Sequence, residues 1–190
     1  MADLAIMMAG HVSIPLYPTL TAESIEEILI HSESKAIIIG KLDHYESLKS
    51  GIPSIHRIGI ETYGTNESDS WEKIIANTSP LTNAPSLSPD DLMTIVYTSG
   101  TTGKPKGVMH AFKSFHATLS VAKVELNFPP RPSLFSYLPM SHIAERIGIE
   151  TMGLLLGAKF SFSENLQTFA RNLADTQPDY FFADTTAIGV

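Results

Sequence analysis

The chain has 190 residues and a formal net charge of −7, with 13 basic residues, 20 acidic residues and no cysteine. Because there is no basic run, nucleic acid is not an expected partner, and without cysteine neither a disulfide framework nor thiolate chemistry is available. A hydrophobic content of 43% is ordinary for a globular protein with a buried core. No segment reaches the roughly 18 apolar residues of a transmembrane helix. We therefore expect a cytoplasmic protein, to which peripheral membrane contact can be added.

Helical and strand patterns alternate along the first half of the sequence. The predicted elements are, in order, a helix at 1–10, a strand at 12–16, a helix after Thr21, a strand at 36–40, a weak helix at 43–50, a strand at 54–60 and a helix opened by Ser70. Thr21 is a suitable N-cap, and Ile25, Ile28 and Leu29 share one face of the helix that follows it. Residues 77–90 contain three prolines and are predicted to form a linker.

The second half continues the same alternation. Its predicted elements are a strand at 92–97, a helix at about 110–123, a strand at 134–138, a helix from Ser141 to Leu156 that Gly157 ends, a strand at 158–162, a helix at 165–175 and a strand at 180–183. Repeated strand–helix units predict an α/β fold, with a mostly parallel sheet and helices on both faces. Ligands of such sheets bind at the carboxyl ends of the strands, which is where residues 98–107 fall.

Residues 96–108 carry the strongest functional signal of the chain. Glycines at 100, 103 and 107 allow positive φ and bring backbone N–H groups close to an oxyanion, and the neighbouring hydroxyls and lysines add donors and positive charge. The alternative is a Ser/Gly-rich surface turn, but the expected strand–loop–helix context favours phosphate binding. The residues predicted to bind phosphate are Thr98, Ser99, Gly100, Thr101, Thr102, Gly103, Lys104 and Lys106.

Two common phosphate-binding motifs do not fit this segment. A P-loop needs Ser or Thr after its Gly-Lys pair, where this chain has Pro105, and the dinucleotide-binding G-x-G-x-x-G pattern is absent. The segment instead closely resembles the signature of the adenylate-forming ligases, a superfamily that includes acyl-CoA synthetases, luciferases and peptide-synthetase adenylation domains. Every position from Ile95 to Lys106 agrees with that signature.

Four further segments narrow the resemblance to long-chain fatty-acid–CoA ligases. Residues 136–146 are the most diagnostic of that branch, and residues 10–18, 162–166 and 178–183 also resemble it. The resemblance implies that residues 1–183 are part of the large N-terminal domain of such a ligase, incomplete at both ends. Residues 184–190 do not match the family and are expected to be an aberrant tail. We therefore expect an internal fragment that arose by frameshift or truncation.

The resemblance also implies an activity and roles for individual residues. The implied reaction is ATP- and Mg²⁺-dependent conversion of a long-chain fatty acid to acyl-AMP, followed by transfer to CoA. Ser99, Thr101, Thr102 and Lys106 would hold the β- and γ-phosphates, with Thr102 also contacting the metal. The resemblance makes Lys106 and His142 the candidate catalytic residues. His142 would lie where acyl chain and phosphates meet, or would be a histidine in ordinary packing at a helix start.

The sequence also gives expectations about one residue pair, the binding partners and the alternatives to an active ligase. Glu145 and Arg146 are expected to pair structurally. The partners implied are small molecules only: fatty acid, ATP and CoA. The alternatives to an active ligase are a catalytically inactive remnant and a nucleotide-binding fragment that works with a second chain.

Overall fold

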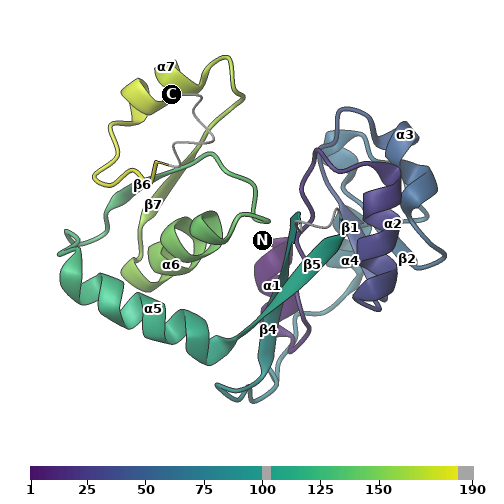
Figure 1. Ribbon diagram of the computed structural model, residues 1–190, viewed down its shortest axis with the longest axis horizontal. Helices are drawn as coiled ribbons and strands as arrows, with labels where there is room; N and C mark the ends of the chain where they lie inside the picture. The colour runs from purple at the N-terminus through teal and green to yellow at the C-terminus, as the bar shows by residue number, and fades with distance from the viewer. Residues whose placement is uncertain (100–103, 184–190) are drawn as a thin grey trace. The chain divides into compact units, whose positions relative to one another are not determined.

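The computed structural model describes residues 1–99 and 104–183. The chain divides into two compact units (Figure 1). Unit 1 consists of Met1–Leu87 and Met93–Met109, and unit 2 consists of Ser88–Leu92 and His110–Val190. The expected domain boundary at residue 183 stays a prediction, and the tail at 184–190 lies outside the described residues.

A small parallel sheet forms the centre of one part of unit 1. Its strands are β1 (Ala36–Ile39), β2 (His56–Gly59) and β3 (Asp69–Ser70), in that order. Ile38 lies opposite Ile58, which in turn lies opposite Asp69. The two strands at 36–40 and 54–60 were predicted. The two-residue strand β3 was not, because so short a segment has no periodicity to recognise.

Helix α2 (Ala22–His31) packs on this sheet, as Figure 1 shows. The Oγ1 atom of Thr21 accepts a hydrogen bond from the Ser24 N–H at 3.2 Å, which confirms the predicted N-cap. Ile25 and Leu29 form a core cluster with Ile39 of β1 and Ile52. The apolar face of α2 therefore fixes this helix to the sheet, as the sequence predicted.

Short helices complete unit 1. They are α1 (Ala2–Met8), α3 (Tyr45–Leu48), 3-10 turns at Lys49–Gly51 and Glu61–Tyr63, and α4 (Trp71–Asn77). Ser70 caps α4 as predicted, because its Oγ atom accepts from the Lys73 N–H at 3.2 Å. Glu67 binds both α3 and the turn after it. Its carboxylate accepts a hydrogen bond from the Tyr45 hydroxyl of α3 and forms an ion pair with Lys49 of the turn at 2.8 Å. These partners lower the pKa of Glu67, while burial raises that of Tyr45.

Unit 2 is built around two parallel strands, β6 (Ser133–Ser136) and β7 (Lys159–Phe162). Leu134 and Phe135 of β6 are fully buried. The remaining elements are α5 (Phe112–Glu125), a π-helix at Glu145–Thr151, α6 (Met152–Leu156) and α7 (Phe169–Thr176). Gly157 ends α6 with a φ of 61°, the left-handed conformation that favours glycine at this position.

The predicted α/β fold class is confirmed, with parallel pairing in two of the three sheets in the described part of the chain. Two predicted strands are reduced to single bridges: residues 12–16 contribute only Ser13, opposite Thr94, and residues 180–183 only Tyr180, opposite Leu134. The helix predicted at 165–175 begins later, at Phe169. Asn165 precedes it and its side chain accepts from the Thr168 N–H at 2.9 Å, which favours a turn over a helix.

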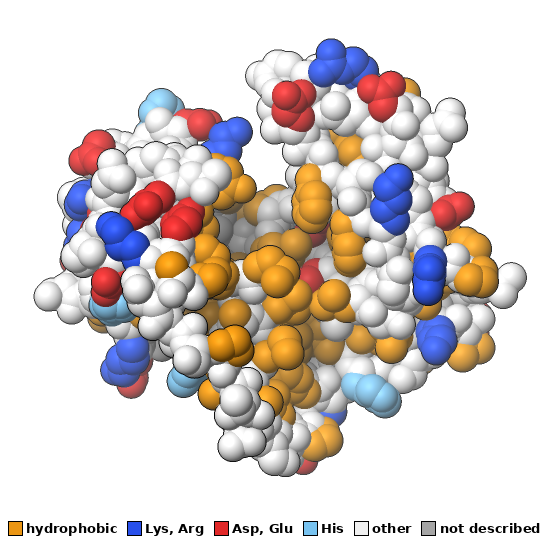
Figure 2. Space-filling view, turned by 180° about the vertical axis from the view of Figure 1, so that it is seen from behind, with side chains coloured by type: hydrophobic (Ala, Val, Ile, Leu, Met, Phe, Trp, Pro, Cys, Tyr) orange, Lys and Arg blue, Asp and Glu red, His pale blue; other side chains and the backbone are white. Residues whose placement is uncertain are grey.

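Hydrophobic side chains also reach the surface, as the orange atoms of Figure 2 show. In unit 2 they include Val124 of α5 and Phe162 of β7, whose exposed fractions are 76% and 68%. Within residues 1–99 and 104–183, none of the helices has the length and apolar character needed to cross a bilayer.

The close approach of Gly51 to the backbone of Ala22 gives a test of the packing of unit 1. A Cβ added at Gly51 would lie 1.9 Å from the carbonyl oxygen of Ala22, at the start of α2. We expect Gly51→Ala to lower the free energy of unfolding by about 1–3 kcal/mol or more, because backbone must move to accept the methyl group. Urea denaturation measures this loss. The exposed neighbour Ser50→Ala is the control, and an equal effect of both changes would contradict the packing described.

Candidate phosphate-binding site

Strand β4 (Leu92–Ser99) carries the start of the predicted phosphate-binding segment. It is held by the chain around Ser13. The Ser13 N–H donates to the Met93 carbonyl at 3.2 Å, and the Ile95 N–H donates to the Ser13 carbonyl at 3.1 Å. The Thr94 hydroxyl, which is fully buried, donates to the same carbonyl at 2.7 Å. These hydrogen bonds therefore hold β4 in place, and Thr98 is the second-last residue of this strand.

The segment is followed by a second strand, β5 (Pro105–Ala111), which pairs with β4. So few residues separate the two strands that they must form an antiparallel hairpin. The expected strand–loop–helix context is therefore wrong. Helix α5 begins only at Phe112, after β5, so its N-terminal N–H groups do not adjoin residues 98–104. Pairing with β4, which local sequence patterns do not reveal, extends residues 105–111 into a strand.

Gly107 has a different role from the one predicted. It does not have a positive φ. A Cβ at this position would instead lie 2.8 Å from Cγ2 of Ile95 and 3.1 Å from Cζ of Tyr97. Gly107 is thus needed for the close approach of β5 to the side chains of β4. Gly100 and Gly103, for which positive φ was also predicted, lie outside the described residues.

A cavity of about 380 Å³ adjoins this hairpin within unit 1. Thr98 at the end of β4 and Pro105 at the start of β5 contribute to its wall. Ser24 and Ile28 of α2, with Tyr17 and Thr19 of the preceding segment, line it as well. The cavity therefore combines apolar surface with hydroxyl groups at the point where the predicted phosphate-binding segment begins and ends.

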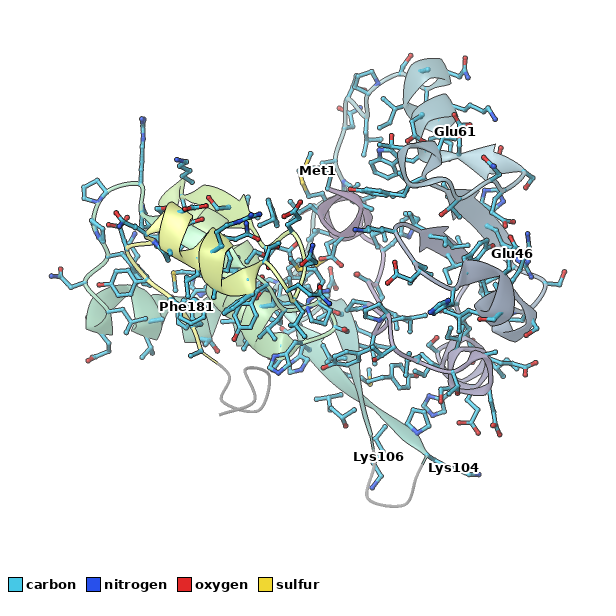
Figure 3. All side chains as sticks on the ribbon, turned by 90° about the horizontal axis from the view of Figure 1, so that it is seen from above. Met1, Glu46, Glu61, Lys104, Lys106 and Phe181 are labelled. Carbon is cyan, nitrogen blue, oxygen red and sulfur yellow. The ribbon has the colours of Figure 1, made fainter. Side chains whose placement is uncertain are left out.

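Lys104 and Lys106 lie on the other side of the segment from Thr98. Both side chains are exposed, and Figure 3 shows them at the end of the hairpin, next to the grey trace. No ion pair joins either lysine to an acidic residue of the described chain. Two positive charges without acidic partners are thus available to an anion at this position.

The structure describes only part of the predicted site. Ser99 is the last residue of β4, and Thr98 is exposed. Gly100, Thr101, Thr102 and Gly103 lie outside the described residues, so their phosphate contacts, and the metal contact of Thr102, stay predictions. Sequence reasoning missed Tyr97, which is buried and reads as an ordinary strand residue.

His142 lies in unit 2, whereas Lys104 and Lys106 lie in unit 1. Its Nδ1 atom accepts a hydrogen bond from the Ala144 N–H at 3.3 Å, so the neutral ring carries its hydrogen on Nε2. The predicted cap by Ser141 is wrong: helical residues begin at Ile143, and the buried Ser141 hydroxyl has no hydrogen-bond partner in the part of the chain that the structure describes. A turn intervenes, closed by the His142 N–H donating to Pro139 at 2.8 Å.

Glu145 is a buried acid that sequence reasoning treated as a structural partner of Arg146. Only 1% of its surface is exposed. Its carboxyl accepts hydrogen bonds from the Ser136 hydroxyl and from the backbone N–H groups of Tyr137 and Leu138. Burial nevertheless raises the pKa of Glu145 above its ordinary value of 4.5. The side chain thus ties the π-helix to the end of β6.

This raised pKa predicts a pH dependence. The folded chain binds the Glu145 proton more tightly than the unfolded chain, so the free energy of unfolding falls as pH rises from 4.5 through the raised pKa. We expect Glu145→Gln to make this fall smaller in urea denaturation followed at several pH values. The exposed Glu164→Gln is the control. An unchanged pH dependence in Glu145→Gln would show that this carboxyl does not titrate differently in the folded chain.

The structure resembles part of a known ligase. It matches the crystal structure of the anthranilate CoA ligase AuaEII in complex with anthranoyl-AMP with a TM-score of 0.83 and 21% identity, over 96% of this chain and 37% of that one. The chain thus has the fold of part of the N-terminal domain of an adenylate-forming ligase. A protein-family model described as AMP-binding enzyme matches residues 1–188, and the chain belongs to that family.

Relatives by sequence include long-chain acyl-CoA synthetases. The chain is 33% identical to long chain acyl-CoA synthetase 7, peroxisomal, of Arabidopsis thaliana, over 84% of this chain and 25% of that protein. It is 30% identical to long chain acyl-CoA synthetase 6, peroxisomal, of the same plant, over 94% of this chain and 28% of that protein. The chain therefore spans about a quarter of the length of these relatives.

Proposed function

We propose that this chain supplies the phosphate-binding part of an enzyme that activates a long-chain fatty acid with ATP and transfers it to CoA. The observation that carries the proposal is the pair of exposed lysines, Lys104 and Lys106, without acidic partners in the described residues, beside a cavity that Thr98 and Pro105 line. Family membership and the names of the two plant relatives support the substrate class.

These residues fit a polyphosphate. A hydrogen bond to a charged group makes a net contribution of about 1.5–3 kcal/mol, so each of the two lysines would favour binding of a phosphate chain. Thr98 lies near the end of β4 and Lys106 near the start of β5, which supports the proposal that both residues bind the same anion. Mg²⁺ would supply further charge neutralisation, and Thr102 is the residue proposed to contact it.

The proposed reaction has two steps. A fatty carboxylate is already ionised at pH 7, so its oxygen attacks the α-phosphorus of ATP without a general base. A carboxylate–phosphorus bond forms and the bond to pyrophosphate breaks, giving acyl-AMP. The deprotonated sulfur of CoA then attacks the acyl carbon and releases AMP. Lys106 would stabilise the charge that develops on the leaving pyrophosphate, and His142 is proposed to act where acyl chain and phosphates meet.

Replacement of Lys106 tests this role. In an intact ligase that contains this chain, we expect Lys106→Ala to lower adenylation by about 10- to 100-fold, because one developing charge loses its partner. Fatty-acid-dependent exchange of pyrophosphate into ATP measures the step, and calorimetry measures ATP binding by the same protein. Lys123→Ala, an exposed lysine of α5, is the matched control. Equal activity of both variants would remove Lys106 from the site.

A nucleotide-binding fragment is the second candidate, because the chain spans about a quarter of its relatives. Calorimetry together with the exchange measurement separates the two candidates, because both predict ATP binding and only the ligase predicts exchange. ATP binding with fatty-acid-dependent exchange supports the ligase, and ATP binding without exchange supports the fragment. Failure of the unchanged chain to bind ATP with Mg²⁺ would contradict both and leave a catalytically inactive remnant.

Cellular location also stays a proposal. The sequence-based expectation is the cytoplasm, with peripheral membrane contact as an addition, whereas both plant relatives are named peroxisomal. Fluorescence microscopy of the tagged chain would decide between a diffuse, a membrane-associated and a peroxisomal distribution.

A further inference from the structure

A hydrogen bond links α2 to the strand that precedes the phosphate-binding segment. The Nδ1 atom of His31 lies 2.7 Å from the hydroxyl of Tyr97, and the two rings meet edge to face with centroids 5.8 Å apart. His31 is exposed, whereas Tyr97 is only 5% exposed. Burial raises the pKa of Tyr97. The last residue of α2 thus holds the hydroxyl of the buried Tyr97 side chain.

Tyr97 contacts both strands of the hairpin where they meet the segment. It directly precedes Thr98 on β4, and its ring carbon Cζ lies 3.1 Å from where a Cβ of Gly107 would be on β5. Its position therefore affects both ends of the segment. We call Thr98 and residues 104–107 the loop base.

One face of α2 points toward this loop base. Ser24, Ile28 and His31 follow the i, i+4, i+7 spacing of a single helix face. Ser24 and Ile28 line the cavity that Thr98 and Pro105 also line. His31 is the last residue of α2, and its hydrogen bond with Tyr97 adds a further contact between this helix face and β4.

We propose that His31 is a positioning residue that acts through Tyr97 to hold the loop base in place. The expected consequence, tighter binding of the phosphates, rests on the proposed function. The expected structural effect, a more firmly held loop base, does not depend on that function. Because His31 is exposed, removing its ring leaves the core of unit 1 packed.

Amide hydrogen exchange of the isotopically labelled chain, followed by NMR without any ligand, tests the structural effect. We expect His31→Ala to speed exchange at the loop base about 2- to 10-fold, the loss of one hydrogen bond. Tyr97→Phe removes the same hydrogen bond from the other side and should have a similar effect. His31→Asn, whose amide can replace Nδ1, should restore slow exchange.

Two controls separate positioning from a general loss of stability. His44→Ala removes another exposed histidine and should leave exchange unchanged. Ile39→Val weakens the core and should speed exchange evenly through unit 1. The proposal is overturned if His31→Ala matches His44→Ala at the loop base, or if it acts as evenly as Ile39→Val.

Calorimetric titration of the same variants with ATP and Mg²⁺ tests the consequence. Binding should weaken by about 2- to 10-fold in His31→Ala and recover in His31→Asn. If the unchanged chain binds no ATP, the proposed function fails, and the exchange measurement still decides whether His31 positions the loop base. If ATP binds equally well to His31→Ala and the unchanged chain, His31 has no role in phosphate binding.

Discussion

The candidate site depends on the pairing of β4 with the chain around Ser13. The Ser13 carbonyl accepts from both the Ile95 N–H and the buried Thr94 hydroxyl, and the Ser13 hydroxyl donates to Asp3 of α1. A buried polar group without a partner is destabilising, so these bonds fix the register of the two segments. The same pairing fixes two walls of the cavity, because lining residues 15–20 closely follow Ser13 and the lining residue Thr98 belongs to β4.

Local signals in the sequence predicted most of the helices and the parallel strands. Thr21 and Ser70 were recognisable as N-caps because the cap and its N–H partner lie three residues apart. Features that depend on distant residues were not predictable. β5 exists because it pairs with β4, and Gly107 is required by Ile95 and Tyr97 rather than by its own φ. Ser141 has the residue type of a cap, but the turn from Pro139 delays the helix.

The residue types of the candidate site could be predicted from the sequence, but only part of its geometry could. Its glycines, hydroxyls and lysines are contiguous, so the resemblance was visible in one segment. Tyr97 and His31 are 66 positions apart in sequence and carry no joint pattern. The pKa shifts of two acids were unpredictable for a related reason. Lys49 lowers the pKa of Glu67, whereas burial raises that of Glu145, and both surroundings appear only in the fold.

A phosphate-binding segment between two strands differs physically from one at the start of a helix. A helix N-terminus supplies about half a positive charge and a set of oriented N–H groups. The hairpin has no such dipole, so positive charge must come from side chains, and Lys104 and Lys106 are placed to provide it. Contacts that hold β4 and β5 in place, such as that of Tyr97 with His31, are therefore proposed to favour binding of an anion next to these strands.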